Sequence, residues 1–148
     1  MAIALAAVFS TILTDSRNGV SDIPLSVRGQ VASPLQTSTV IIPDGASNPY
    51  RQLNFEPKIV RVILGINNTV SWVNQDSVAT NVVSDTNYVD PVSGPFDSRN
   101  PAYLSTTGNG FLNPSKTFNF TFTQPGTFGY HGVPHPWMQG TVIAMPLQ

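Results

Sequence analysis

Short runs of β-branched and aromatic residues, each stopped by proline or glycine, limit the fold of this chain more than any other feature. The 148 residues include 13 prolines and 11 glycines. Proline interrupts helices and glycine favours turns, so a chain cut this often has little room for long helices. In Thr117–Phe122 the phenylalanines alternate with polar residues, which gives an extended strand one aromatic face. Because no sustained helical period accompanies this pattern, the sequence predicts an all-β protein.

The segments that carry the β-type pattern are expected to be strands. They are Thr37–Ile42, Lys58–Leu64, Val70–Asn74, Asn81–Ser84, Thr117–Phe122, Thr127–His131 and Gly140–Met145. Turn residues at 65–69 join the second and third of these runs and favour an antiparallel hairpin between them. Strands at these spacings, without intervening helices, are typical of a Greek-key β-sandwich or barrel. Residues 85–115 form so long a connection that we expect it to be functional or locally ordered.

The chain divides into one domain and an N-terminal tail. Residues 37–148 carry the strand pattern and are long enough for one hydrophobic core, whereas residues 14–36 are polar and irregular and indicate a linker or a clinging arm. Residues 1–13 are almost wholly apolar, but the run is shorter than the roughly 20 residues of a membrane-spanning helix. It is either the remnant of a signal or anchor segment or a short arm packed on the domain. The first alternative predicts an extracytoplasmic protein, with membrane association through residues 2–13.

Composition excludes several classes of function. The formal net charge is -1 and charged residues make up 10% of the chain, so there is no basic stripe for nucleic acid. No cysteine is present, and a disulfide framework is therefore ruled out. The sequence also contains no nucleophile elbow, no paired-carboxylate spacing, no phosphate-binding loop and no three-histidine constellation. We expect a protein that does not bind nucleic acid and is not an enzyme.

The segment Tyr130–Gly140 concentrates the residues with metal-binding chemistry. It contains His131, His135 and Met138 between prolines, directly after a β-rich run. A histidine and a methionine three residues apart have the spacing with which one loop can supply ligands to a mononuclear copper ion. The loop has no thiolate to complete such a site.

Four segments, taken in order, resemble the cupredoxins, most closely those of the amicyanin and plastocyanin type. They are Val70–Asp76, Asn81–Val82, Pro125–His131 and Pro134–Gly140, and the resemblance extends over roughly residues 37–147. It implies a cupredoxin-like Greek-key sandwich from a family of electron carriers, in which two His, one Cys and a weakly bound Met hold copper.

The resemblance also assigns individual positions in the loops. His135 and Met138 match two of the ligand positions, and Asn81 matches the residue that ties the two ligand loops together. At the two remaining ligand positions, Thr80 stands where the family has His and Gly132 where it has Cys.

These substitutions bear directly on copper chemistry. A blue-copper centre depends on a copper–thiolate bond, and a threonine hydroxyl does not replace an equatorial imidazole. We therefore expect no blue-copper centre and weak or absent copper binding. His131 should point away from the position faced by residue 132, because side chains alternate along a strand, although a kink at Gly132 would allow a chelate with His135. Asp76 and Asp85 could offer oxygen ligands, but turn capping is the simpler role for each.

Two functional hypotheses follow. In the first, the protein is a cupredoxin whose own copper site is vacated and which acts as a binding or assembly domain. Its protein partner would dock on the apolar loop around Pro134, Pro136, Trp137 and Met138. In the second, it is a copper-binding or electron-transfer protein with an incomplete, open or type 2-like site at His135, helped by Met138 and His131, where Gly132 leaves room for a further ligand.

Overall fold

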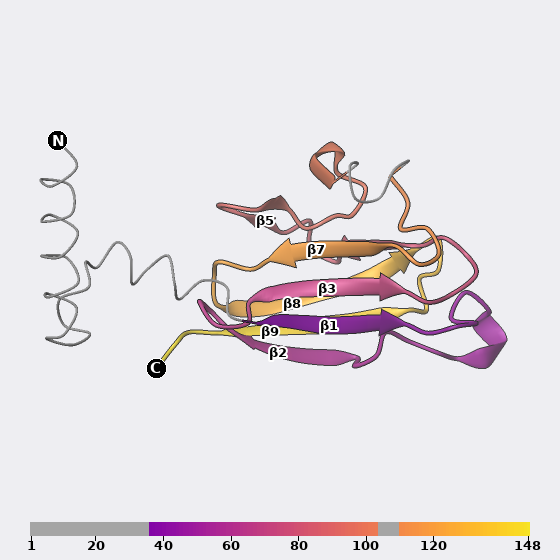
Figure 1. Ribbon diagram of the computed structural model, residues 1–148, viewed down its shortest axis with the longest axis horizontal. Coiled ribbons are helices and arrows are strands. Elements are labelled where there is room, and N and C mark those ends of the chain that lie inside the picture. The colour runs from indigo at the N-terminus through magenta and orange to yellow at the C-terminus, as the bar shows by residue number, and fades with distance from the viewer. Residues whose placement is uncertain (1–35, 104–109) are drawn as a thin grey trace, which may run out of the picture. The chain divides into compact units, whose positions relative to one another are not determined.

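The computed structural model describes residues 36–103 and 110–148, whose strands lie in two facing layers (Figure 1). Short 3-10 helices, η3 (Pro49–Arg51) and η4 (Pro101–Tyr103), lie in the connections. The strands are β1 (Thr37–Ile42), β2 (Ile59–Ile63), β3 (Thr69–Asn74), β4 (Asn81–Ser84), β5 (Val89–Asp90), β6 (Gly94–Pro95), β7 (Thr117–Thr121), β8 (Gly126–Val133) and β9 (Gln139–Met145). The all-β prediction is confirmed, and the expected strands form with small shifts at their ends.

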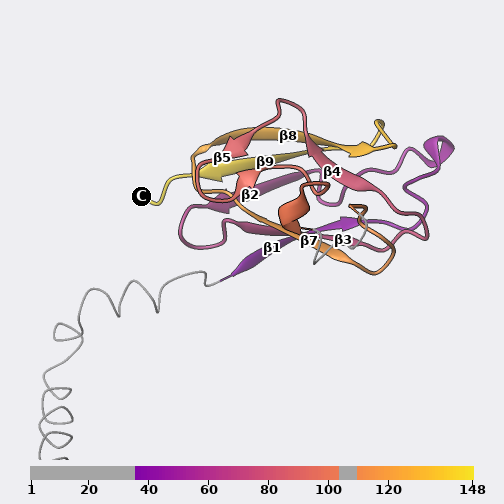
Figure 2. The same ribbon diagram turned by 90° about the horizontal axis from the view of Figure 1, so that it is seen from above.

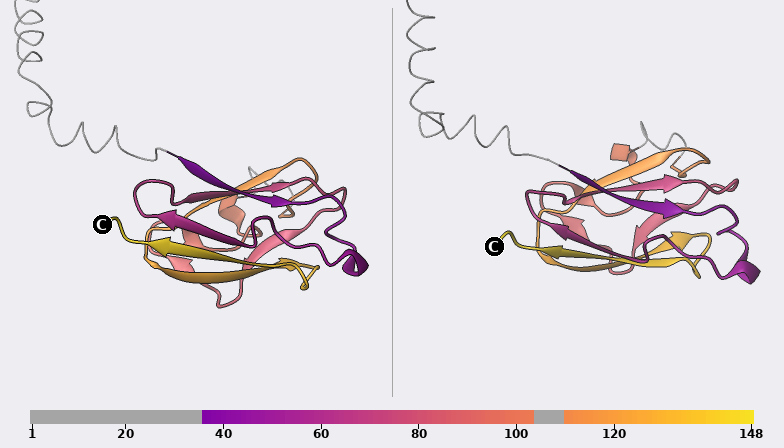
Figure 3. Two further views of the ribbon diagram at one scale, coloured as in Figure 1. Left: turned by 90° about the horizontal axis from the view of Figure 1, so that it is seen from below. Right: turned by 60° about the horizontal axis from the view of Figure 1, so that its bottom comes forward.

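The two layers are a three-stranded and a four-stranded sheet. One has the order β1-β3-β7 and the other the order β2-β9-β8-β4, and β5 and β6 form a separate short hairpin. β1 runs parallel to β3 and β2 runs parallel to β9, while the remaining neighbours are antiparallel. Seen from above and from below, the two sheets face each other across the core, which confirms the β-sandwich (Figures 2 and 3).

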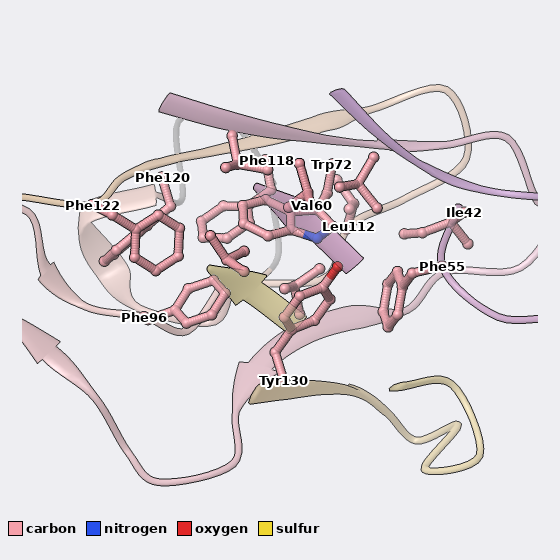
Figure 4. Packing of buried hydrophobic residues seen from close by; sticks show 14 of the residues in the cluster. Ile42, Phe55, Val60, Trp72, Phe96, Leu112, Phe118, Phe120, Phe122 and Tyr130 are labelled. Carbon is pink, nitrogen blue, oxygen red and sulfur yellow. The ribbon is translucent and has the colours of Figure 1, made fainter. Parts of the chain in front are cut away.

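Aromatic side chains fill the space between the sheets. Phe118 and Phe120 point inward and are buried, whereas Asn119 between them is exposed, as the alternation in the sequence predicts. Phe118 packs against Trp72, whose ring contacts Tyr130, and Phe120 belongs to the same buried cluster (Figure 4). Each such side chain contributes about 1.5–3 kcal/mol when removed from water, so this cluster stabilises the frame that carries the loops.

The predicted hairpin between the second and third runs is wrong. β2 pairs in parallel with β9, and β3 lies in the opposite sheet between β1 and β7. The connection at 64–68 crosses from one layer to the other, and Asn68 Nδ2 donates to Phe122 O at 2.6 Å beyond it. Val62 and Trp72 both face the core from opposite sides in this arrangement. A hairpin within one sheet would place both strands in the same layer and leave the opposite layer without β3.

The long connection at 85–115 is locally ordered wherever the structure describes it. It contains β5, β6 and η4, and its buried Asp90 accepts hydrogen bonds from the backbone of Val92 and Ser93 and from Thr123 in the next turn. The expectations for residues 1–13, and for all but the last residue of 14–36, lie outside the described part. Within residues 36–103 and 110–148, no helix is long and apolar enough to cross a membrane.

Candidate functional site

The loop between β8 and β9 is a tight turn built around His135. Met138 N donates to His135 O at 3.0 Å, and Gly132 N donates to Met138 O at 2.9 Å, so the loop closes on its own backbone. Pro134 and Pro136 flank His135 and are exposed, while the imidazole turns inward and is only 8% exposed. The turn therefore presents two prolines to solvent and one histidine to the interior.

Four positions that the sequence singles out meet behind this turn, and we call them the site cluster: Thr80, Gly132, His135 and Met138. His135 Nδ1 lies 3.2 Å from Thr80 Oγ1 across the two loops. A Cβ atom added to Gly132 would lie 3.0 Å from His135 O, 3.3 Å from Thr80 Oγ1 and 3.4 Å from Met138 Cβ. The missing side chain of Gly132 thus points at the place where the other three residues converge.

The space beside Gly132 is closed. A single methyl group there would already meet His135 O and Thr80 Oγ1 more tightly than ordinary van der Waals contact and Met138 Cβ at its lower limit. Thr80 and Met138 are fully buried beside it. The expectation that Gly132 leaves room for a further ligand is therefore not met in this structure, because the carbonyl oxygen of His135 and the hydroxyl of Thr80 already close in on that position.

Thr80 is held from a third direction by the 110–112 segment. Thr80 N donates to Leu112 O at 3.1 Å, and Leu112 N donates to Thr80 O at 2.8 Å. With its amide nitrogen facing acceptors, the Asn81 side chain donates to Gly110 O at 2.9 Å and to Thr80 O at 3.1 Å. The side chain of Asn81 therefore anchors the 110–112 segment, whereas the resemblance implied a tie to the loop after β8.

Burial sets the charge state of His135. Removal from water lowers the pKa of the imidazole, and the nearby Asp76 carboxylate offsets part of this shift. His135 is consequently neutral at neutral pH and forms a hydrogen bond with the Thr80 hydroxyl in which the tautomer decides the donor.

Asp76 caps a loop. Burial raises its pKa, but hydrogen bonds from the backbone of Ser47, Gly45 and Ser77 outweigh burial and hold the pKa below its ordinary value. Both carboxylate oxygens are used in these contacts, in agreement with the capping interpretation.

His131 lies outside the site cluster. Its Nδ1 atom is 2.6 Å from Asp85 Oδ1, and both side chains are partly exposed on the outer face of the sheet. The strand stays regular through Gly132, which pairs with Val82 in the β4–β8 register, so no kink brings His131 to His135. Within the described residues, no group of three or more His, Cys, Asp or Glu side chains could hold a metal ion.

Sequence reasoning missed the two segments that surround the cluster. Trp137 Nε1 donates to Ala46 O at 2.9 Å, and the ring centroids of Trp137 and His135 are 5.3 Å apart. Ala46 and Leu112 are distant in sequence from the loop and carry no distinctive side-chain chemistry. Only the turn signal at 43–45 marked the first segment, and only the unusual length of the 85–115 connection marked the second.

Comparison with known proteins identifies the family. The family model described as "Copper binding proteins, plastocyanin/azurin family" matches residues 45–145. The chain belongs to this family. The cupredoxin assignment made from the loop motifs is thereby confirmed.

Two relatives of this cupredoxin are informative. Amicyanin from Paracoccus denitrificans is 30% identical over 92 residues, which are 62% of this chain and 59% of amicyanin, so the match spans less than two thirds of that relative. The structure of a novel purple cupredoxin from Nitrosopumilus maritimus matches with 25% identity and a TM-score of 0.54, over 73% of this chain and 99% of that chain. The cupredoxin sandwich predicted from sequence is the fold of this chain.

Proposed function

We propose that this cupredoxin forms no type 1 copper centre of its own and acts as a binding or assembly domain. One observation carries the proposal: His135 Nδ1 is paired with the Thr80 hydroxyl inside a closed cluster. By the resemblance to the family, Thr80 and Gly132 occupy the positions of a ligand His and the ligand Cys. The proposal includes no catalytic activity.

The donor chemistry of the cluster supports this reading. It offers one imidazole nitrogen, one neutral hydroxyl and the thioether of Met138, and the chain contains no cysteine. A blue-copper site needs a thiolate and two imidazoles in its equatorial plane, so these residues do not fit such a centre. Copper entry would also have to break the hydrogen bond between His135 and Thr80.

The surface at this end of the sandwich suggests what the domain binds. Pro134 and Pro136 are exposed and Trp137 is half-buried, but Met138 is fully buried and presents nothing to a partner, unlike the surface predicted from sequence. Val78 and Phe111 are each 43% exposed; Val78 precedes Thr80 by two residues, and Phe111 is next to Leu112. We call Val78, Phe111, Pro134, Pro136 and Trp137 the docking surface.

All five side chains of the docking surface are uncharged and largely apolar. The chemistry that complements them is a protein with an apolar, uncharged contact area. The location we propose is extracytoplasmic, which is supported by family membership together with the apolar sequence of residues 2–13.

Copper titration tests the first half of the proposal. Purified full chain is mixed with one equivalent of Cu(II) and examined by visible absorption and electron paramagnetic resonance. We expect no strong charge-transfer band and only heterogeneous copper that a mild chelator removes. Thr80→His combined with Gly132→Cys is the positive control, because it returns the two side chains that a blue site requires. A stoichiometric, strongly coloured copper complex of the unaltered chain would overturn the proposal.

The competing function is a copper protein with a type 2-like site at His135. It is favoured by one observation, namely that the His135 imidazole turns inward and its Nδ1 atom faces the Thr80 hydroxyl inside the site cluster. It predicts a single nitrogen-ligated Cu(II) signal that disappears in His135→Ala and persists in His131→Ala. A Cu(II) signal that persists in both variants would reject this function.

A crosslinking experiment tests the second half. A photo-crosslinker placed at position 136 is used to identify a candidate partner, which is then purified and titrated by calorimetry. We expect Pro136→Asp and Val78→Asp each to weaken binding at least tenfold, since a charge would enter an apolar contact. Thr127→Asp, on the exposed face of β8, is the matched control and should leave the affinity unchanged. Equal affinities for all variants would place the interface elsewhere.

A further inference from the structure

Thr80 connects three segments that are far apart in sequence. Its backbone exchanges two hydrogen bonds with Leu112, its own carbonyl accepts from the Asn81 side chain, and its hydroxyl pairs with His135. It is 1% exposed, so none of these contacts competes with bulk water. The residue thus sits where the β3–β4 connection, the 110–112 segment and the β8–β9 loop meet.

Each of these segments also supplies part of the docking surface. Val78 precedes Thr80 by two residues, Phe111 is next to Leu112, and Pro134 and Pro136 stand on either side of His135. The surface is therefore composite, and its shape depends on how three separate segments are fixed relative to one another. A fourth contact, from Trp137 Nε1 to Ala46 O, holds the remaining side of the loop.

We infer that Thr80 is a positioning residue whose hydroxyl clamps the β8–β9 loop through His135 and so assembles the docking surface without a metal ion. In a copper-loaded site, a metal joins these loops through its ligands. Here a direct hydrogen bond between two buried neutral groups makes the same connection. Thr80 therefore does more than replace the family's ligand His: its hydroxyl supplies a structural contact between the two loops.

The geometry explains why the clamp needs a residue such as Thr80 opposite a glycine. The Cβ position of Gly132 lies only 3.3 Å from the Thr80 hydroxyl and 3.0 Å from the His135 carbonyl oxygen, so a larger side chain at 132 would press against both residues. Glycine lets the two loops approach until the imidazole and hydroxyl are in contact. The two substituted positions are consequently coupled: Gly132 provides the space for the approach of the two loops, and Thr80 provides the hydroxyl that contacts His135.

Two variants separate the hydrogen bond from packing. Thr80→Val keeps the shape of the side chain and removes the hydroxyl, whereas Thr80→Ser keeps the hydroxyl and removes a methyl group. If the hydroxyl positions the loop, serine restores it and valine does not. If only the packed volume matters, the opposite order holds.

Amide hydrogen exchange in the full chain, with chelator present, measures the clamp. The reporter amides are Met138 and Gly132, which close the loop on His135 O and Met138 O. We expect exchange at these two amides to rise at least tenfold in Thr80→Val and to stay within about threefold of the unaltered chain in Thr80→Ser. The amides of Val62 and Trp72 in the sandwich core are the internal control and should not change. Equal exchange in the unaltered chain and Thr80→Val would overturn the inference.

A measurement on the unaltered chain keeps the test independent of how the variants fold. The imidazole 15N shifts of His135 should show one fixed tautomer with a hydrogen-bonded Nδ1, both with and without chelator. Averaged shifts like those of a free imidazole would also overturn the inference. The inference rests on the proposed function only in assuming that a partner uses the docking surface. If no partner binds there, the hydrogen-exchange and 15N-shift results still decide whether Thr80 holds the β8–β9 loop.

Discussion

At the scale of single residues, two glycines of the β8–β9 hairpin are explained by their neighbours rather than by their backbone angles. Gly132 allows Thr80 and His135 to meet. Gly140 makes room for Tyr130: a Cβ atom there would lie 2.3 Å from Tyr130 Cζ and 2.4 Å from its hydroxyl oxygen. The Tyr130 ring is fully buried, and in Figure 4 its hydroxyl points toward the indole of Trp72. Neither the ring nor the hydroxyl can move aside without disturbing the core.

Gly140→Ala is expected to destabilise the domain by about 1–3 kcal/mol, because the methyl group overpacks the Tyr130 ring. Urea unfolding followed by far-ultraviolet circular dichroism measures the effect. Gly129→Ala on the same hairpin is the matched control, since the atoms nearest to its Cβ belong to the exposed side chain of Asp85, which can rotate away at the cost of a surface contact with His131 and without disturbing the core. If the two alanine variants lose the same free energy of unfolding, close packing at Gly140 is not the cause.

At the scale of elements, the β5–β6 hairpin depends on one buried carboxylate. Asp90 accepts hydrogen bonds from Val92, Ser93, Thr123 and the Tyr88 hydroxyl, which fasten the hairpin to the turn between β7 and β8. Burial raises the pKa of Asp90, but the hydrogen bonds from Thr123, Val92 and Ser93 outweigh burial and leave it below the ordinary value. The charged form is therefore the one that the folded state stabilises.

Asp90→Asn should lower the free energy of unfolding at neutral pH by about 1–3 kcal/mol, because an amide group faces donors that a carboxylate satisfied. The contribution of Asp90 is fully present above the pKa of the carboxyl in the unfolded chain, and it is lost as the pH falls through the lower folded value. The difference between Asp90→Asn and the unaltered chain should thus shrink toward strongly acidic pH. Asp44→Asn, at an exposed turn, serves as the control. A difference that does not vary with pH would contradict this account.

The sequence predicted the strands well and their partners poorly. Alternation in Thr117–Phe122 defines a half-buried strand locally, and β7 forms there. The partner of β2 is β9, which lies about eighty residues further along the chain, and no local pattern can specify that pairing. Turn residues at 65–68 fit a crossing between sheets as well as they fit a hairpin, so the choice depended on the rest of the core.

In the candidate site, too, the sequence predicted the residues but not the contacts between them. The loop motifs identified the four positions that converge, because spacing and residue type are written in the sequence. They did not reveal that Thr80 and His135 are in contact, since this depends on a distance between two loops. Leu112 and Ala46 hold the cluster through hydrogen bonds of their backbone atoms, which any residue type could form, so the sequence does not mark them.

At the scale of the whole molecule, one buried and one partly buried phenol limit stability at high pH. Burial, with a smaller effect from the hydrogen bond to Asp90, raises the pKa of Tyr88 to about 12. Burial also raises the pKa of Tyr130. An unfolded tyrosine has a pKa of about 10, so the folded state holds these protons more tightly than the unfolded state does.

The contribution of these two tyrosines to the free energy of unfolding should therefore be constant below about pH 10 and fall as the pH rises toward the folded pKa values. Tyr88→Phe should reduce the slope of this decline without abolishing it, because Tyr130 continues to titrate. Urea unfolding between pH 8 and the alkaline limit of solubility provides the measurement. An identical slope in Tyr88→Phe and the unaltered chain would show that Tyr88 ionises equally easily in both states.

The parallel pairing of β2 with β9 also governs when the protein can fold during its synthesis. β2 is made early and β9 last, yet the ladder from Ile59 to Ile63 forms only with Thr141 to Met145. The four-stranded sheet therefore stays incomplete until the residues of β9 have left the ribosome, and β2 remains without its ladder partner while the intervening residues are made.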